Sequence, residues 1–494
     1  MKRAGSAISP LIAVDRRSRE PIHRQIYESF RSAILSGNLH PGQRVPSTRA
    51  LSTELQISRM PLLTAYAQLL AEGYFESRIG QGTVISASLP DRMAPTPAAI
   101  AGKPQRMAGP RRIAERCARL PENFRPAWIR GAGAFCMGEI ALDEFPHRIW
   151  SNLHVRAARN GSTVHSYGDP LGLWELREVI AEYLRTTRAV ACDATQVLIV
   201  HGSQHGVELA ARVLLDPDST AWVEEPGYKL TRDILALAGC RIAPVPIDDE
   251  GLNVDAGIKL ARNARAAFVT PSHQYPLGMT MSLSRRLQLL RWADRSGAWI
   301  VEDDYDSEFR YDSMPIPSLQ GLDTNGRVIY IGTFSKVLFP ALRLGYLVVP
   351  SDLVEPFGKM RRSSDLGPAI LNQLVLTDFI REGHFARHIR RMRTLYRERR
   401  SALVDALARD LPEFAIHGAD AGLHLTLFLH DKMSDVERAM DAARQKLWLW
   451  PLSSSYASRS PKQGFILSFA STPAKEMRSA VQRLRSVLYP RGHA

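Results

Sequence analysis

The sequence predicts two folds in one chain: a small, mostly α-helical domain at the N-terminus and a large α/β domain after it. Three observations support this. The 494 residues exceed what one core usually organises, basic charge is concentrated at the N-terminal end, and the remainder alternates short apolar runs with amphipathic stretches. We expect the first domain at residues 1–86, a linker at 87–117 and the second domain at 118–494.

The charge distribution separates the two ends of the chain. Residues 1–112 hold 16 Lys and Arg against seven Asp and Glu, a net of +9, which leaves only +5 of the total +14 for the other 382 residues. Basic charge gathered at one end suggests a polyanionic partner for that end. A solvated basic tail accounts for the same count, so the charge needs support from the elements themselves.

Composition also limits the compartment and the chemistry. No apolar run approaches the roughly 18 residues of a membrane span, and the first residues lack the pattern of a signal peptide. The four cysteines, Cys117, Cys136, Cys192 and Cys240, lie far apart without a C-x-x-C pair. That usage fits a reduced cytoplasm, and we expect neither a metal site nor a disulfide framework.

Helical periodicity comes first in the chain. In "PIHRQIYESFRSAILSGNL" the apolar residues recur every four positions up to Gly37, at Ile22, Ile26, Phe30 and Ile34. After the turn "HPGQRVPS", Ser47 can cap a second helix that buries Leu51 and Leu55.

A third helix follows the short turn "QIS". Ser58 can cap it, and its expected inward residues are Leu62, Tyr66, Leu69 and Leu70. The run "EGYFESRIGQGTVIS" then places Gly80 and Gly82 between two β-prone segments, as in a tight hairpin.

Helix, helix, short turn, helix and hairpin is the order of a winged helix-turn-helix. Arg59 opens the third helix, where a recognition helix meets bases or phosphates. The alternative is a small helical dimerisation module, and the basic charge favours DNA binding over it.

The segment "PSTRALSTELQISRMPLLTAYAQLLAEGYFESRIGQGTVIS" resembles the DNA-binding domain of the GntR family over nearly its whole length. The resemblance implies DNA contacts from Arg49, Arg59 and the wing residue Gly80, and we add the helix-opening Ser47 and Ser58. The expected partner is double-stranded operator DNA. One departure is Met60-Pro61, where polar residues such as Asn-Thr are common, and this leaves the half-site sequence open.

The large domain alternates apolar runs and helical stretches. Five apolar runs, "VLIV", "AWVEEP", "AAFVTP", "WIVEDD" and "VIYIG", are separated by amphipathic segments, which predicts a parallel sheet buried on both faces. Ligands in such folds lie beyond the carboxyl ends of the strands. The chemistry-bearing residues found there are Gly202, Ser203, Gln204, Asp303, Thr333, Ser335 and Lys336, with Arg343 close behind.

An aldehyde cofactor with a phosphate and a pyridine ring would use this set. Lys336 would form the Schiff base, Asp303 would keep the ring nitrogen protonated, and the other residues would hold the phosphate. Taken singly, each is explained more simply, as a surface lysine, a solvated acidic turn or a plain helix cap. Their common place at strand ends favours the cofactor.

Residues 130–490 resemble the pyridoxal phosphate (PLP) aminotransferases of fold type I. The segments "YGDPLGLWELRE", "GSQHG", "VEEPGY", "TPSHQYPLG", "VEDDYDSEFRY" and "GTFSKVLFPALRLGY" are similar to those of the MocR subfamily of GntR regulators. The resemblance implies that Tyr305 bonds the ring hydroxyl and that Tyr228 stacks on the ring. It also implies that Tyr167 reaches the phosphate of a partner subunit, and hence a homodimer.

Two positions depart from the aminotransferase pattern. Where an asparagine commonly faces the ring, this chain has "HQYPLG", so His273, Gln274 or Tyr275 must take that place. Where aminotransferases clamp the substrate carboxylate with an arginine, "GFILSFAS" carries Ile466, and an apolar side chain cannot form that bidentate pair.

The sequence thus predicts a cytoplasmic, dimeric, PLP-dependent transcriptional regulator that senses PLP or an amine-bearing metabolite through Lys336. One alternative is a catalytic aminotransferase with an accessory DNA-binding domain, against which Ile466 counts. Another is a binding protein that has lost PLP, against which the intact pair of Lys336 and Asp303 counts.

Overall fold

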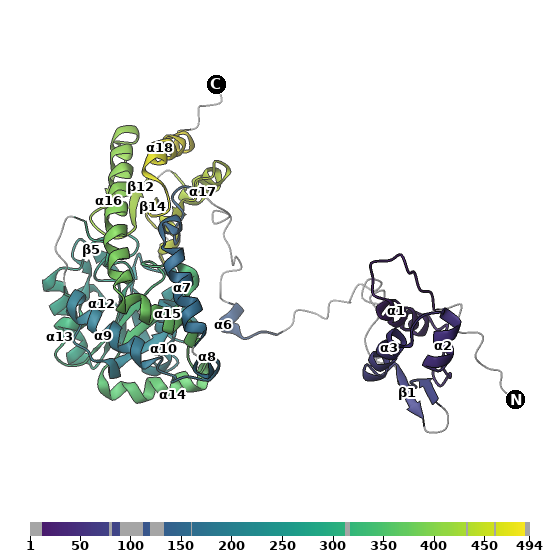
Figure 1. Ribbon diagram of the computed structural model, residues 1–494. Coiled ribbons are helices and arrows are strands. Elements are labelled where there is room, and N and C mark those ends of the chain that lie inside the picture. Colours follow the sequence, from purple (N-terminus) through teal and green to yellow (C-terminus); the bar gives the residue numbers. More distant parts are fainter. Residues whose placement is uncertain are drawn as a thin grey trace. The chain divides into compact units, whose positions relative to one another are not determined.

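The computed structural model describes residues 12–78, 82–88, 112–118, 133–159, 161–311, 317–430, 433–458 and 461–489. The chain forms two compact units, Met1–Arg112 and Ile113–Ala494 (Figure 1). Most of the expected linker and the wing residue Gly80 lie outside the described residues.

The first unit has the predicted order of elements. Three helices, α1 (Ile22–Leu35), α2 (Thr48–Leu55) and α3 (Arg59–Ala71), precede the hairpin of β1 (Phe75–Arg78) and β2 (Gly82–Ile85). The two strands pair antiparallel, with Phe75 opposite Ile85. This order confirms the winged helix-turn-helix.

Three aromatic rings form the centre of the first unit. Phe30 from α1, Tyr66 from α3 and Phe75 from β1 meet edge to face with centroids 5.2–5.5 Å apart, so each element contributes one ring to the same core. Ile26 and Ile34 are buried beside them, as predicted, while Ile22 and Leu55 pack at the border of this core.

Two details of α3 differ from expectation. Leu70 is 38% exposed, because Leu69 already occupies the inward direction and the next residue is rotated by about 100° on a helix. Ser58 stands at the N-cap position, but its side chain makes no capping hydrogen bond. The cap predicted for α2 is confirmed, since the Ala50 N–H donates to Ser47 Oγ over 3.2 Å.

An eight-stranded sheet organises the second unit, in the order β3-β10-β9-β8-β7-β4-β5-β6. The strands are β3 (Val197–Val200), β4 (Thr220–Glu225), β5 (Arg241–Asp248), β6 (Gly251–Leu252), β7 (Ala266–Val269), β8 (Trp299–Asp304), β9 (Val328–Thr333) and β10 (Gly345–Val348). Neighbours from β9 through β5 run parallel.

Two strands outside the predicted runs, β10 and β6, depart from the parallel arrangement. β10 runs antiparallel to both of its neighbours, because the segment after β9 is too short for a helical crossover and returns the chain directly. The two-residue β6 folds back on β5 in the same way. The sheet is therefore mixed, with a parallel centre.

Helices cover both faces of the sheet (Figure 1). α10 (Ser203–Leu214), α11 (Lys229–Leu237) and α14 (Val354–Ser364) share one apolar cluster with residues of six strands. The other face packs against α9 (Trp174–Arg188), α12 (Val254–Leu260) and α13 (Leu283–Ser296). Burial on both faces explains why the strands are nearly continuous apolar runs.

The C-terminal part adds a four-stranded antiparallel sheet in the order β11-β12-β14-β13. Its strands are β11 (Ile416–His417), β12 (His424–Phe428), β13 (Trp450–Pro451) and β14 (Gly464–Ser468). The remaining helices are α6 (Glu115–Ala118), α7 (His147–Ala158), α8 (Ser162–His165), α15 (Ile370–Arg381), α16 (His384–Asp410), α17 (Asp435–Arg444) and α18 (Ala474–Leu488). In the described part of the chain, none of the helices has the length and apolar content to span a membrane.

The adjacent leucines of α3 test the packing of the first unit. Leu69→Ala should lower the free energy of unfolding by about 2–5 kcal/mol, because Leu69 is fully buried and its loss leaves a cavity. Leu70→Ala should change it by no more than about 0.5 kcal/mol. Urea unfolding of the two variants is the measurement, and equal losses would mean that α3 is rotated from the orientation described.

Candidate functional site

One edge of the large sheet gathers most of the predicted site residues. The parallel strands β4, β7, β8 and β9 end at this edge, and β10 begins there, since Gly345 pairs with both Thr333 and Val200. The residues at or just after the ends of these strands and of β3 include Gly202, Ser203, Gln204, Tyr228, His273, Asp303, Tyr305, Thr333, Ser335 and Lys336, and Arg343 lies just before β10.

Lys336 is half-buried after the end of β9. Burial lowers the pKa of its ammonium group, against the opposing charges of Asp306, Glu139 and Asp303. A side chain placed on Gly138 would come within 3.8 Å of Lys336 Nζ, so the loop before α7 closes over the amine. A lysine with a lowered pKa keeps more of its amine neutral and nucleophilic.

Asp303 carries a buried carboxylate oxygen, Oδ1, for which no hydrogen-bond partner exists among the described residues. Burial raises the pKa of Asp303 to about 7, and the nearby charges of Asp304, Asp306 and Glu224 add to the rise. An unpaired buried carboxylate is costly, and a cationic or N–H-bearing ligand would relieve it.

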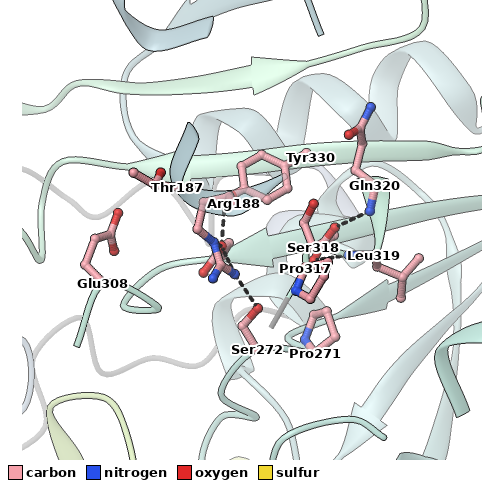
Figure 2. A network of polar contacts seen from close by, with 12 residues as sticks. Thr187, Arg188, Pro271, Ser272, Glu308, Pro317, Ser318, Leu319, Gln320 and Tyr330 are labelled. Carbon is pink, nitrogen blue, oxygen red and sulfur yellow. Dashed lines mark hydrogen bonds and ion pairs between the residues drawn. The ribbon is translucent and has the colours of Figure 1, made fainter. Parts of the chain in front are cut away.

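The neighbours of Asp303 on β8 point the other way, because side chains alternate along a strand. Asp304 pairs with Arg188 Nη2 over 2.7 Å and accepts the Tyr330 hydroxyl over 2.6 Å. Glu302 accepts the backbone N–H groups of Leu319 and Gln320, each over 2.9 Å. Figure 2 shows this network, with Arg188 directed at Ser272, whose Oγ accepts from Arg188 Nη2 over 2.8 Å.

His273 is buried beside Tyr305 and Asp306. Its Nδ1 lies 3.1 Å from the Asp306 carboxylate and 3.1 Å from the Tyr305 hydroxyl, whereas its buried Nε2 has no partner in the described part of the chain. Gly422, at φ +70°, packs so closely that any side chain there would overlap His273. A tight wall therefore holds the imidazole in place.

Two of the three residues that could face a ring remain at this pocket. Gln274 is excluded, because its Nε2 donates to the Pro226 carbonyl over 2.9 Å and its Oε1 accepts from the Leu277 N–H over 3.1 Å. Gln274 thus stabilises the loop through these two hydrogen bonds. His273 and Tyr275 stay at the pocket, where the ring of Tyr275 meets that of Tyr228 edge to face at 5.3 Å.

A positively polarised cradle lies at the start of α10. Gly202, at φ +84°, turns the chain into α10, whose first residues are Ser203 and Gln204. A side chain on Gly202 would come within 3.5 Å of Arg343 Nη1, so the guanidinium stands beside the helix N-terminus. The N-terminus of α10 and the Arg343 guanidinium are both positive, and at this distance they favour an anion between them.

The hydroxyl-bearing turn after β9 borders this cradle. Thr333 is buried, and its Oγ1 accepts the Ser335 N–H over 3.2 Å. Tyr167 is not brought to the group within one chain: it is 88% exposed between α8 and α9.

Ile466 forms part of the apolar wall of this region. It is fully buried on β14, opposite Thr426 of β12, and clusters with Tyr275, Leu277 and Leu452. The partly buried Met137, Tyr228 and Tyr305 pack against the same cluster. The wall next to the pocket is therefore apolar and aromatic where an arginine would hold a carboxylate.

Two groups of described residues have the spacing of a metal site, which the sequence did not suggest. His273, Asp306 and His424 form one, and His201, His205 and Asp365 form the other, with ligand atoms within 4.8 Å of one another. In the second group His205 Nδ1 accepts the His201 N–H over 3.2 Å, which fixes the proton on the nitrogen that faces Asp365. That tautomer opposes metal ligation by His205.

The residues predicted to contact DNA lie on the first unit. Arg49 and Arg59 are exposed, and the Arg59 Nε–H donates to Thr48 Oγ1 over 3.1 Å, which ties the start of α3 to the start of α2. Sequence reasoning missed Arg44, an exposed arginine that bridges to Val84 of the wing and packs on Gly82. The sequence feature that could have identified Arg44 is its place as a basic residue just before the "VPS" turn.

Comparison with protein families matches both units. The model of class I and II aminotransferases matches residues 134–484, and that of the bacterial regulatory proteins of the gntR family matches residues 22–85. The chain is 39% identical to the probable rhizopine catabolism regulatory protein MocR of Rhizobium meliloti, over 96% of this chain and 95% of that protein. It is 33% identical to the pyridoxine biosynthesis transcriptional regulator PdxR of Corynebacterium glutamicum, over 93% and 94%.

Solved structures similar to the large unit are aminotransferases. The kynurenine aminotransferase of Pyrococcus horikoshii, in complex with PMP, superimposes with a TM-score of 0.71 at 25% identity, over 80% of this chain and all of that one. The α-aminoadipate aminotransferase LysN of Thermus thermophilus, complexed with N-(5'-phosphopyridoxyl)-L-leucine, gives 0.70 at 26% identity, over 76% and 97%.

The raised pKa of Asp303 predicts a pH dependence. The folded protein holds this proton more tightly than the unfolded chain, where the pKa of aspartate is about 3.9, so the stabilising contribution is present at low pH and disappears as pH rises towards about 7. Protein stripped of small ligands should therefore lose thermal stability between about pH 4 and about pH 7, and Asp303→Asn should reduce that loss.

The exposed Asp249→Asn serves as the control, and the melting temperature across this pH range is the measurement. Glu224, whose pKa burial also raises to about 7, should retain part of the slope in Asp303→Asn. Identical slopes in the wild type and Asp303→Asn would show that this carboxylate is not buried as described.

Proposed function

This chain belongs to the MocR-type GntR transcriptional regulators, and from that premise we propose that it binds operator DNA through its first unit and PLP through its second. The aminotransferase fold implies PLP. The observation that carries the proposal is the buried, partnerless Oδ1 of Asp303, in the electrostatic range of Lys336. Such an oxygen would accept a hydrogen bond from a protonated pyridine ring nitrogen.

The residues present fit this cofactor. When bound, PLP supplies an electrophilic aldehyde carbon and an electron-withdrawing ring. Lys336 would be the amine that holds the aldehyde carbon, and Asp303 would accept the ring N–H. Tyr305, bonded to His273, would serve the ring hydroxyl, and Tyr228, which packs in the neighbouring aromatic cluster, would contact the ring.

The phosphate would occupy the cradle at the start of α10. The N–H groups of Ser203 and Gln204, the hydroxyl of Ser335 and the guanidinium of Arg343 supply hydrogen bonds and charge there, with Thr333 supporting the turn. The exposed Tyr167 is proposed to reach the phosphate of a second subunit, which makes the homodimer part of the proposal.

Regulation rather than turnover is supported by Ile466. A buried apolar wall cannot pair with the carboxylate of an α-amino acid, so such a substrate would lose the anchor that orders it for transamination. The relatives named as transcriptional regulators support the same role. A catalytic aminotransferase with an accessory DNA-binding domain is the second candidate, supported by the structural neighbours and testable by steady-state transaminase assays.

The apolar wall around Ile466 also indicates which class of effector the protein binds. We propose either PLP itself or a primary amine without a carboxylate, bound next to Lys336 among Tyr228, Tyr275 and Ile466. Either ligand acts on transcription only by binding the DNA-competent and DNA-incompetent arrangements of the protein unequally. We place this regulator in the cytoplasm, where DNA and PLP are both available.

The first test of the proposal concerns Lys336. Purified protein should be yellow, and borohydride should fix the cofactor covalently on Lys336, because a lysine is the expected bond partner of the aldehyde. Lys336→Ala should lose the visible band and the covalent adduct while retaining its far-ultraviolet circular dichroism. Lys359→Ala, at an exposed lysine of α14, is the control. A wild type that stays colourless after reconstitution with PLP would refute the cofactor assignment.

The second test concerns the arginines of the first unit. Arg49→Ala and Arg59→Ala should each weaken binding to a specific operator duplex by about 1–3 kcal/mol if they contact bases or paired phosphates. Arg241→Ala, at an exposed arginine of the large unit, should leave the affinity unchanged. Fluorescence anisotropy at moderate salt is the measurement, and wild-type affinity in both variants would contradict the docking of α3 on DNA.

The third test concerns Ile466 and uses two ligands that differ by one carboxylate. 2-Phenylethylamine should change the visible spectrum of the PLP-loaded protein at a lower concentration than phenylalanine does, because the carboxylate has no cation to meet at Ile466. Ile466→Arg should reverse this order, with the melting temperature checking that it folds. A wild type that prefers phenylalanine would contradict the missing-clamp argument without touching the PLP assignment.

A further inference from the structure

The outer face of α3 is apolar at the end where the helix begins. Met60 is 67% exposed and Leu63 is 40% exposed, three positions apart and therefore on one side of the helix. Ala67, one turn further along, is exposed as well. Thr64, next to Leu63, donates its hydroxyl proton to the Met60 carbonyl over 3.2 Å, so that proton is committed to the helix itself.

This arrangement is unusual for a helix that already has a buried side. α3 buries Leu62, Ala65, Tyr66 and Leu69 in the core of the first unit, and the opposite side of such a helix is normally polar. Exposed apolar side chains gathered in this way indicate a surface that becomes covered.

The charges around the apolar face identify what covers it. Arg59 opens α3 and donates its Nε–H to Thr48 Oγ1, which places it beside the start of α2, where Arg49 is exposed. Residues 1–112 carry a net charge of +9. An apolar strip bordered by arginines is complementary to a polyanion that presents an apolar feature between rows of negative charge.

Double-stranded DNA has that combination. In the major groove, between the two phosphate rows, the only apolar group on the edges of the unmodified bases is the 5-methyl of thymine. A recognition helix enters this groove with its N-terminal residues towards the bases. We propose that Met60 and Leu63 read thymine methyl groups, so that the core of each half-site contains A·T pairs with thymines in contact with these side chains.

This inference rests on DNA binding by the first unit and adds how the sequence is read. A protein surface or a second copy of α3 would also cover Met60 and Leu63, but neither explains the arginines at the start of α2 and α3 as well as DNA does.

Uracil substitution tests the proposal directly. A specific duplex is selected from a random pool with the full-length protein and then resynthesised with deoxyuridine in place of thymidine at single positions. Deoxyuridine lacks only the methyl group and keeps the O4 acceptor, so base pairing and the other groove contacts are preserved. Each contacted methyl should contribute about fourfold to the affinity, the ratio that corresponds to ~0.8 kcal/mol for one buried carbon group.

Variants of the two side chains supply the second arm. In Met60→Ser and Leu63→Ser the thymine and uracil duplexes should bind with nearly equal affinity, because the group that contacts the methyl is gone. Leu70→Ser, two turns beyond Leu63 on the same helix and 38% exposed, should keep the full sensitivity to uracil. Circular dichroism confirms that these exposed substitutions leave the fold intact.

Four results would overturn the proposal. Thymine and uracil duplexes that bind equally well to the wild type would show that methyl groups are not read. An equal uracil penalty in the wild type and both serine variants would place the methyl contact elsewhere. Serine variants that keep their DNA affinity but change the oligomeric mass would assign the face to a protein contact. Selection of no sequence at all would also end the docking of the first unit on DNA.

Discussion

The unpaired carboxylate oxygen of Asp303 is the constraint on which the pocket of the large unit depends. The acidic run of β8 alternates in direction, so on one side Glu302 accepts backbone N–H groups and Asp304 pairs with Arg188 through its Oδ2. Asp303 is left on the other side, where the charges of Asp304, Asp306 and Glu224 raise its pKa further. A buried carboxylate in this state is destabilising until a proton or a cationic ring compensates it. The proposed ligand would bring positive charge to this one atom.

The remainder of the pocket is consistent with a regulator that has kept the means of holding a ring and a phosphate. The start of α10 and Arg343 form an anion cradle, and burial lowers the pKa of Lys336. The C-terminal sheet contributes Ile466 and an aromatic cluster in place of a carboxylate clamp. These features together favour recognition of a cofactor or an amine over repeated turnover of amino acids.

Sequence patterns predicted the elements better than the details within them. Apolar runs followed by glycine or acidic residues located the strand ends correctly, because burial on both faces forces such runs. The antiparallel β10 escaped prediction, since strand direction depends on how the chain returns after Thr333 and not on composition. Leu70 and Leu69 are indistinguishable by residue type, and only the rotation of α3 about Phe30 and Phe75 decides which one is buried.

The pocket itself was predictable in position and less so in its contacts. Asp303 and Lys336 stood out because several chemistry-bearing residues share one place, the carboxyl ends of the apolar runs. The exclusion of Gln274 and the bonding of His273 to Tyr305 and Asp306 depend on side-chain packing between distant segments. No local spacing encodes such contacts.

The central claim is that the ligand state of the large unit controls DNA binding by the small one. The most direct measurement is titration of the cofactor-free, full-length protein on its selected operator duplex, alone, with PLP, and with PLP and a panel of primary amines, in the wild type and in Lys336→Ala. The account predicts that at least one ligand state changes the affinity or the footprint of the wild type and leaves Lys336→Ala unaffected. Identical affinity and footprint in every ligand state of the wild type would contradict it.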